Sequence, residues 1–500
     1  MIPLLSLLIF LPLVAAALLA LPVGDRAARW AFVGVTAAEL VLSVALWAAY
    51  ATPAAGALAF EEQVEWVPRL GISYHVGVDG LSLPLVLLTT LTFAACAVFV
   101  LREQQRPRLQ AALFLALETT CLGLFASADL VLFFVFFDLS IVGIYLSING
   151  WGHGERRAAA LLFFLYTFLG SLALLLGFVG LYLASDPHTF DMVALAADPP
   201  LQGSGATGGF VLAAILLGLA IKTPTVPFHT WLPPAHTNAP AIGSVVLAAV
   251  LLKMGTYGFV RIGMPMLPEA WRAWAWTLVV MGLVSIIWGA LVALAQTDLK
   301  RMIAYTSVNH MGYVVLALGA AGLVGGSPGE TAQARSTAVS GAVTQMVSHG
   351  LLTGALFLLA GVVWARHESY DLAAYGGLAA RAPAFATLLV VGALGSLGLP
   401  GLSGFAAELQ IFVGSIELAP VAGVGLVGIL LMTAVMLRAM QGMLTGPPGP
   451  LSEGFGDVRL HESAPIAVLL VLSLVVGLAP QLLLDLIGPA ADAVAAMVVR

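Results

Sequence analysis

Charged residues are scarce in this sequence. Only 9% of its 500 residues are Asp, Glu, Lys or Arg, and 60% are hydrophobic, whereas a soluble protein carries roughly 25% charged residues. Three residues are lysines, and two of them, Lys222 and Lys253, lie inside hydrophobic runs. The composition excludes an ordinary soluble domain, and the apolar runs are too long and continuous for barrel strands. We therefore predict an all-α polytopic membrane protein.

Cysteine is equally rare, and cofactor-binding motifs are missing. Cys96 and Cys121 both lie in apolar runs, which indicates buried structural thiols rather than a disulfide or metal framework. The sequence has no phosphate-cradling glycine loop, no haem-attachment motif and no iron–sulfur cysteine spacing. We therefore expect no cofactor and no metal in this chain, and we assign any redox chemistry to partner subunits.

Fourteen hydrophobic segments are each long enough to cross an apolar layer of about 30 Å. The first lacks a basic leading region, so it is interpreted as a membrane helix rather than a signal peptide. The segments cover residues 2–21, 30–50, 80–101, 111–126, 128–148, 159–184, 208–228, 240–261, 273–295, 302–323, 336–365, 383–415, 420–445 and 464–487.

Two of these segments are interrupted. Segment 7 runs into four prolines directly after Lys222, and segment 12 contains Pro400, Gly401 and Gly404. Broken helices at membrane depth are tolerated where the backbone lines a cavity or is packed in protein. The two interruptions are five segments apart, which suggests a five-helix unit used twice, as in transporters built from inverted repeats.

The loop cations predict the orientation. Thirteen of the twenty Lys and Arg residues lie in odd-numbered loops, five lie in even-numbered loops or at the termini, and Lys222 and Lys253 lie within segments. Cytoplasmic loops carry an excess of Lys and Arg. We therefore expect the odd loops to face the cytoplasm and both termini to lie on the outer side.

Asp138 lies near the middle of segment 5. A lone aspartate there would be protonated and hydrogen-bonded. A nearby lysine would change this, because an opposite charge favours the ionised form of each partner, and Lys222 is the natural candidate. A pair of this kind that opens leaves a lysine with a lower proton affinity, so it could move protons by electrostatics alone.

Lys253 and Glu408 are two further charges inside segments. Lys253 is too far from either end of segment 8 to reach water comfortably, so a proton-relay role is favoured over a snorkelling side chain. Glu408 follows the interruption of segment 12 and could face an aqueous cavity, with a hydrogen-bonded structural acid as the alternative. Charges at such depth are usually functional.

Several other side chains are candidate relay groups. Glu118 in segment 4 is either a relay or the partner of a neighbour. His310, expected to open segment 10, and His349 in segment 11 suit a relay, because imidazole titrates near neutral pH; buried neutral histidines are the alternative. His229 and His236 belong to the proline-rich break and are interpreted as mainly structural, with a relay role as the alternative for His229.

Longer motifs resemble a known family. The string AIKTPTVPFHTWLPPAHTNAPAIGSVVLAAVLLKMGTYGFVR is similar to the central signature of the proton-translocating antiporter-like subunits of complex I, the NADH-quinone oxidoreductase. VGVDGLSLPLVLLTT, DLVLFFVFFD, DLKRMIAYTSVNHMG and SHGLLTGALF also match, in the same order. The resemblance covers essentially the whole chain, and it is strongest to the subunit M, or chain 4, branch.

The resemblance implies a proton axis. Its charged positions would be Asp138, Lys222, Lys253, His349 and Glu408, with the final glutamate typical of the subunit M branch. This chain departs from the family at four positions. Asp138 stands where the family usually has a glutamate, and Gly143 stands where it has a proline. Asn238 stands where it has an acid, and Leu162 stands where a lysine is common. The shorter Asp138 side chain reduces the reach to Lys222 by about 1.5 Å.

The resemblance also implies the architecture and the partners. It predicts fourteen helices, with N-terminal helices in 1–110, a first repeat of helices 4–8 in 111–265, a second of helices 9–13 in 266–446, and helix 14 in 447–500. Sister subunits would flank the chain in the inner (plasma) membrane, and flavin, iron–sulfur clusters and quinone would be bound by partners.

Three functions fit these features to different degrees. The favoured one is a redox-driven proton-translocating subunit of a respiratory NADH:quinone oxidoreductase. A multisubunit sodium/proton antiporter, or a related membrane-bound oxidoreductase, shares the motifs and is the alternative. A stand-alone solute permease fits the broken helices only loosely.

Overall fold

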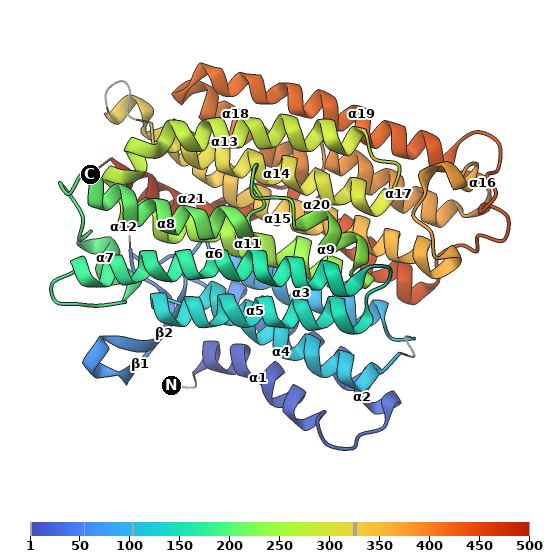
Figure 1. Ribbon diagram of the computed structural model, residues 1–500, viewed down its shortest axis with the longest axis horizontal. Coiled ribbons are helices and arrows are strands. Elements are labelled where there is room, and N and C mark those ends of the chain that lie inside the picture. Colours follow the sequence, from blue (N-terminus) through green and yellow to red (C-terminus); the bar gives the residue numbers. More distant parts are fainter. Residues whose placement is uncertain (1–2, 55, 103–104, 324–327, 500) are drawn as a thin grey trace.

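The computed structural model describes residues 3–54, 56–102, 105–323 and 328–499, and its helices run side by side along the long axis of the molecule (Figure 1). The chain passes through α1 (Leu4–Leu18), α2 (Asp25–Ala49), β1 (Ala59–Val67), β2 (Ile72–Val78), α3 (Leu83–Phe99), α4 (Pro107–Ala126), α5 (Leu130–Trp151), α6 (Arg156–Ala184), α7 (Met192–Ala197), α8 (Ala206–Lys222) and α9 (Leu232–Asn238).

The second part of the chain begins with a helical run that contains two π-helical turns. This run comprises α10 (Ala241–Val246), a π turn (Leu247–Leu251), α11 (Leu252–Gly258), a second π turn (Phe259–Gly263) and α12 (Met264–Met266). The following helices are α13 (Pro268–Leu294), α14 (Leu299–Ala321), α15 (Pro328–His367), α16 (Leu378–Arg381), α17 (Pro383–Ser396), α18 (Ser403–Leu418), α19 (Leu426–Leu444), α20 (Leu460–Leu478) and α21 (Gln481–Val498).

The predicted polytopic membrane architecture is confirmed. Within the described ranges, ten helical segments are long and apolar enough to cross a membrane, and four shorter apolar helices accompany them: α1, α3, α8 and α17. Large apolar side chains also cover outward faces, for example Leu165, Leu169 and Leu176 along α6. Such a surface suits lipid or neighbouring subunits rather than water.

Both predicted helix breaks are present. Helix α8 ends at Lys222 and helix structure resumes at Leu232, while α17 ends at Ser396 and α18 begins at Ser403. Proline removes a backbone donor and clashes with the preceding turn, which explains the first break. In the second, Gly398 and Gly401 adopt positive φ angles of 81° and 98°, a conformation that favours glycine.

Two predictions about the elements are wrong. The all-α expectation did not include the antiparallel hairpin of β1 and β2. The fourteenth segment, predicted as one helix over 464–487, is divided between α20 and α21. Pro480 explains the division, because a residue that precedes proline is disfavoured in helical conformation, and Ala479 has φ −130° and ψ 61°.

Two matching clasps join distant parts of the bundle. At the start of α5, Asp129 forms an isolated β-bridge with Asp191, and at the start of α14, Asp298 forms one with Asp371. Asp129 and Asp298 also accept hydrogen bonds from the first turns of α5 and α14, as N-caps do. Figure 1 places α7, which follows Asp191, and α16, which follows Asp371, at opposite ends of the molecule.

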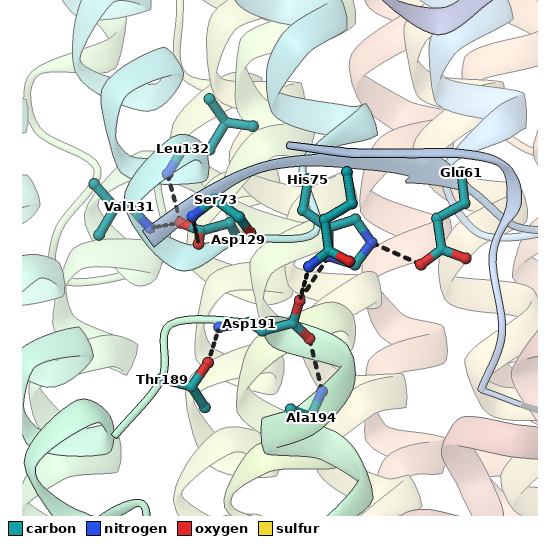
Figure 2. A network of polar contacts seen from close by, with 10 residues as sticks. Glu61, Ser73, His75, Asp129, Val131, Leu132, Thr189, Asp191 and Ala194 are labelled. Carbon is teal, nitrogen blue, oxygen red and sulfur yellow. Dashed lines mark hydrogen bonds and ion pairs between the residues drawn. The ribbon is translucent and has the colours of Figure 1, made fainter. Parts of the chain in front are cut away.

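The first clasp continues into a polar network around His75 of β2 (Figure 2). The Nδ1 atom of His75 lies 2.6 Å from Asp191 Oδ2, and its Nε2 atom lies 2.8 Å from Glu61 Oε1. Asp129 accepts a 3.1 Å hydrogen bond from the backbone N–H of Ser73. The hairpin is therefore fastened to the beginnings of α5 and α7.

The network holds charge of both signs. Burial lowers the pKa of His75, but the hydrogen bonds and charges of Asp191 and Glu61 outweigh burial and raise this pKa above its ordinary value. Burial likewise opposes ionisation of Asp191, yet hydrogen bonds from His75 and from the backbone N–H of Ala194 leave the pKa of Asp191 lowered. Both partners are thus charged between the two shifted pKa values.

We predict that the hairpin loosens at both ends of the pH scale. The His75 contribution is complete below the unfolded histidine pKa of about 6.5 and is lost as pH rises through the raised folded pKa. The Asp191 contribution is present above the unfolded aspartate pKa and is lost as pH falls through the lowered folded pKa. Amide hydrogen exchange of residues 59–78, measured as a function of pH, should show a loss of protection at high pH (the alkaline limb) and another at low pH (the acid limb).

The control for this prediction is His75→Gln. It should reduce local protection by roughly 1–3 kcal/mol, the usual range for a hydrogen bond to a charged group, and remove the alkaline limb. His461→Gln, on α20, should leave the profile of the hairpin unchanged. An alkaline limb that survives in His75→Gln would contradict the assignment.

Helices α13 and α14 approach each other closely through glycine. A Cβ atom on Gly289 would lie 2.7 Å from the backbone nitrogen of Asn309, and one on Gly312 would lie 2.8 Å from that of Ile286. Small residues allow membrane helices to pack backbone to backbone. This contact fixes α14, which carries His310, against α13.

We predict that Gly312→Ala destabilises the protein by about 1–3 kcal/mol, because the new methyl group meets backbone atoms that can move only with their helix. Gly34→Ala is the matched control, since a Cβ there has nothing within 4 Å, and alanine in a helix is favoured over glycine. Thermal unfolding of the purified protein in detergent measures the difference. Equal stability of the two variants would exclude the close-packing argument.

Candidate proton-transfer site

The first element of the site is Lys222 at the end of α8. Its side chain is 1% exposed. Its Nζ atom donates a 3.0 Å hydrogen bond to Ser140 Oγ and lies 4.6 Å from the centre of the Phe137 ring. A helix carboxyl terminus carries partial negative charge, so the end of α8 is a favourable place for a buried ammonium group.

Asp138 does not form the predicted ion pair with Lys222. Among the described residues, the salt bridges join His75 to Glu61 and Asp191, Arg261 to Asp79, and Arg366 to Glu462. Residues two apart on a helix point to nearly opposite sides. Because Ser140 faces Lys222, Asp138 is turned towards Ser171 of α6, and its side chain is only partly buried.

Lys253 and His349 form the centre of the site. The Nζ atom of Lys253 lies 2.6 Å from His349 Nδ1 and donates a 2.6 Å hydrogen bond to the carbonyl of Ala248. Lys253 is 0% exposed and His349 is 2% exposed. The π-helical turn Leu247–Leu251 precedes Lys253, and such turns are frequent at functional sites. Both residues were predicted from the sequence as relay candidates, and the structure places them in direct contact.

Lys222 and Lys253 are connected through tightly packed backbone. A Cβ atom on Gly255 would run into the hydroxyl of Thr223. Thr223 follows Lys222 directly and Gly255 lies two residues after Lys253, so the end of α8 touches the helix that carries Lys253. The Thr223 hydroxyl has no hydrogen-bond partner within the part of the chain that the structure describes.

His310 extends the site from His349 to the break between α17 and α18. Its ring centre lies 5.4 Å from that of His349, and its Nε2 atom lies 3.1 Å from the carbonyl of Ser396, the last residue of α17. The sequence analysis expected His310 at the beginning of its segment. It lies in the middle of α14 instead, because the helix already begins at Leu299.

Glu408 lies on the other side of this break. It is buried, and a Cβ atom on Gly398 would collide with its carboxylate. Tyr313 of α14 is within electrostatic range of Glu408 and packs against Phe412, with ring centres 5.5 Å apart. The break thus brings the carboxylate of Glu408 close to the peptide groups that follow Ser396.

The remaining predicted residues lie beside this line. His229 is buried near Tyr305, with ring centres 6.2 Å apart. His236 stacks on Phe357 at 4.5 Å, and neither of its ring nitrogens has a hydrogen-bond partner among the described residues. Glu118 is buried in α4 and belongs to none of the contacts described above.

Lys300 and Glu39 are two of the buried ionisable residues that were not selected from the sequence. Lys300 was counted among the cytoplasmic loop cations, yet it is 0% exposed, donates a 2.6 Å hydrogen bond to the carbonyl of Ala239 and lies over the ring of Tyr370. Tyr370 in turn lines a pocket together with His153 and Asp298. Glu39, in α2, was overlooked although it stands alone in an apolar run.

A metal centre is not supported. Within residues 3–54, 56–102, 105–323 and 328–499, no group of three His, Cys, Asp or Glu side chains is arranged to hold a metal ion. Cys96 and Cys121 are free and buried. The described interior instead offers a line of side chains that can accept and donate protons.

Comparison with known proteins places the chain in a family of membrane subunits. The family described as NADH:quinone oxidoreductase/Mrp antiporter, transmembrane region, matches residues 127–435, which cover α5 to the middle of α19. The match spans more than half of the chain. The chain therefore belongs to this family.

Within the family, the chain belongs to the subunit M, or chain 4, line. It is 38% identical to NADH-quinone oxidoreductase subunit M of Rhodobacter capsulatus, over 97% of this chain and 95% of the relative. It is 37% identical to an NAD(P)H-quinone oxidoreductase chain 4 of a Nostoc species, over 96% and 89%.

Solved structures share the fold. A chain of respiratory complex I from Thermus thermophilus superposes with a TM-score of 0.88, at 29% identity and 99% coverage of both chains. A chain of the Mrp complex from a Dietzia species superposes with a TM-score of 0.85, at 23% identity, over 98% of this chain and 97% of that one. The second likeness concerns the fold alone.

We predict that Gly398→Ala lowers the stability of the protein by more than backbone strain alone explains. Alanine at positive φ costs roughly 1–2 kcal/mol, and here the methyl group also displaces Glu408. Gly446→Ala is the matched control, with φ 80° and nothing within 4 Å of a Cβ. Thermal unfolding should therefore show a larger loss for Gly398→Ala.

A double-mutant cycle tests the cause. In a Glu408→Ala background, the excess loss from Gly398→Ala should disappear, because the colliding carboxylate is gone. Persistence of the full excess would mean that Glu408 does not occupy the break.

Proposed function

We propose that this chain is a proton-translocating membrane subunit of a respiratory NADH:quinone oxidoreductase. The contact between Lys253 and His349 carries the proposal. A lysine and a histidine 2.6 Å apart in a buried interior favour holding one extra proton between them, because like charges at that distance disfavour double protonation. Membership of the subunit M line supports the same function.

The geometry supports proton movement in steps. His349 faces Lys253 through Nδ1, while its Nε2 atom has no hydrogen-bond partner among the described residues. A proton received from Lys253 at Nδ1 can be released from Nε2 towards His310, since neutral imidazole donates at one nitrogen and accepts at the other. Glu408 then receives the proton across the break.

Lys222 is the proposed beginning of the line. Its ammonium group is held by one hydroxyl and one aromatic face, with no carboxylate in direct contact. The proton affinity of a lysine in such a site changes strongly when nearby charges appear or disappear. Redox chemistry in partner subunits would change those charges, so the chain needs no cofactor of its own; flavin, iron–sulfur clusters and quinone would be bound by partners.

The proposed architecture has fourteen membrane helices. They are α1 to α6, α8 with α9, α10 to α12 as one, α13, α14, α15, α17 with α18, α19 and α20. Two inverted five-helix repeats would occupy 111–265 and 266–446, between N-terminal helices in 1–110 and the last helix in 447–500. The clasps at Asp129 and Asp298 support this division, since they join equivalent elements at opposite ends of the bundle.

The proposed setting is the inner (plasma) membrane of a bacterium. The positive loops would face the cytoplasm and both termini the outer side. Sister antiporter-like subunits would lie on both flanks of the chain. The exposed apolar faces of α2 and α6 are compatible with lipid or such neighbours.

A sodium/proton antiporter subunit is the second candidate, because the family includes Mrp antiporters. Mass spectrometry of the complex purified through a tag on this chain separates the two functions. Flavin-binding and iron–sulfur subunits should co-purify. Recovery of small membrane subunits alone would instead favour the antiporter, and sodium transport in vesicles would be measured next.

We predict that Lys222→Ala in the assembled complex slows proton transfer through this chain on the order of 10² or more, the usual contribution of a positioned proton-transfer group. NADH oxidation coupled to acidification of membrane vesicles gives the number of protons moved per NADH, which should fall. Arg301→Ala, which removes an exposed cation, is the control. Pumping at the wild-type ratio in Lys222→Ala would count decisively against the proposal.

A further inference from the structure

A second pair of ionisable side chains lies outside the line from Lys222 to Glu408. Glu39 is near the middle of α2, and Glu118 is in the second half of α4. Helices α2 and α4 pack against each other, and the two carboxyl groups are within electrostatic range. Both residues are 0% exposed.

Neither carboxyl group has a partner. All four carboxylate oxygens lack a hydrogen bond to any described residue, and neither glutamate belongs to one of the described salt bridges. A buried carboxylate without partners is very costly, whereas the protonated acid is neutral. A protonated carboxyl group also has a proton to donate and an oxygen that accepts, so each of the two acids can take part in proton transfer.

The surroundings of the pair contain few other titratable groups. Cys96 of α3 is near Glu118, and helix α1, which also packs against α4, has no titratable side chain. The hydroxyls of Ser43 and Thr90, 2.7 Å apart, bond to each other one turn beyond Glu39. No cation in the described residues neutralises either acid.

Cys121 of α4 connects the glutamate pair with Lys222, the first residue of the central line. Cys121, one turn beyond Glu118 on α4, is within electrostatic range of both Glu118 and Lys222. Lys222 has no acid in direct contact, because Asp138 faces α6. A route from the pair to Lys222 therefore crosses α4 at Cys121.

We infer that Glu39 and Glu118 form a proton-binding pair that exchanges protons with Lys222 across α4. The ligand is the proton itself, and each of the two carboxyl groups carries one proton when Lys222 is charged. When Lys222 loses its proton to the central line, Glu118 supplies the replacement and receives the proton of Glu39. Glu39 is then the ionised member of the pair until it takes up the next proton. The exchange step rests on the proposed function of Lys222, whereas proton binding by the pair does not.

Infrared spectroscopy of the purified complex tests proton binding. Wild-type minus Glu39→Gln and wild-type minus Glu118→Gln spectra should each show the carbonyl stretch of a protonated carboxylic acid. Each Gln variant should also shift the band of the remaining glutamate, because the two groups interact. Glu65→Gln, which alters an exposed residue of β1, should show no such band.

Two outcomes of this measurement would overturn the inference. Loss of a carboxylate band, instead of a protonated one, would mean that the pair is ionised at rest. A protonated band that sodium ions convert to a carboxylate band would make the pair a cation site. Glu118→Asp, which keeps the acid and should only shift the band, replaces Glu118→Gln if that variant does not assemble.

A second measurement tests the exchange. During steady NADH oxidation the Glu118 band should change in amplitude, and this change should vanish in Lys222→Ala. A band that stays constant in a complex whose pumping depends on Lys222 would overturn the exchange. Full pumping in Lys222→Ala would refute the proposed function, whereas the band at rest would still report proton binding by the pair.

Discussion

A lysine ammonium group in the hydrocarbon layer needs polar partners, and much of the interior is arranged to supply them. Lys253 is held by two contacts of 2.6 Å, one to the carbonyl of Ala248 and one to His349. Ala248 lies inside a π-helical turn, where carbonyls depart from the regular hydrogen-bond pattern. The irregular helix and the histidine together lower the cost of burying the charge.

The same constraint explains where the other helices are interrupted. Lys222 lies at the carboxyl end of α8, and Glu408 reaches back to the peptide groups of the break before α18. A charge is tolerated at membrane depth where backbone dipoles are exposed to it. The close contact of α13 and α14 fixes the position of His310, which lies between His349 and the carbonyl of Ser396. Helix packing and proton chemistry therefore depend on each other.

Much of the site could be predicted because a charge in an apolar run is a local signal. Lys222, Lys253, His349 and Glu408 were recognised in this way, as were both breaks from their prolines and glycines. The pairing of Asp138 was not predictable, because it depends on the rotation of α5 about its axis. Lys300 was missed because its proximity to a loop hides how deeply α14 buries it, and the hairpin because its alternation is weak.

The rotation of α5 has consequences beyond Asp138 itself. With Ser140 towards Lys222, the lysine keeps a hydrogen bond but lacks an opposite charge, so its protonated form depends on groups farther away. Besides Asp138, which is within electrostatic range of Lys222 but turned towards α6, the described interior holds two unpartnered acids on α4 and α2. A buried acid without partners is stable only when neutral, and a neutral acid is a proton donor. The departure at Asp138 and the two unpartnered glutamates are therefore parts of one arrangement, in which the proton source for Lys222 lies across α4.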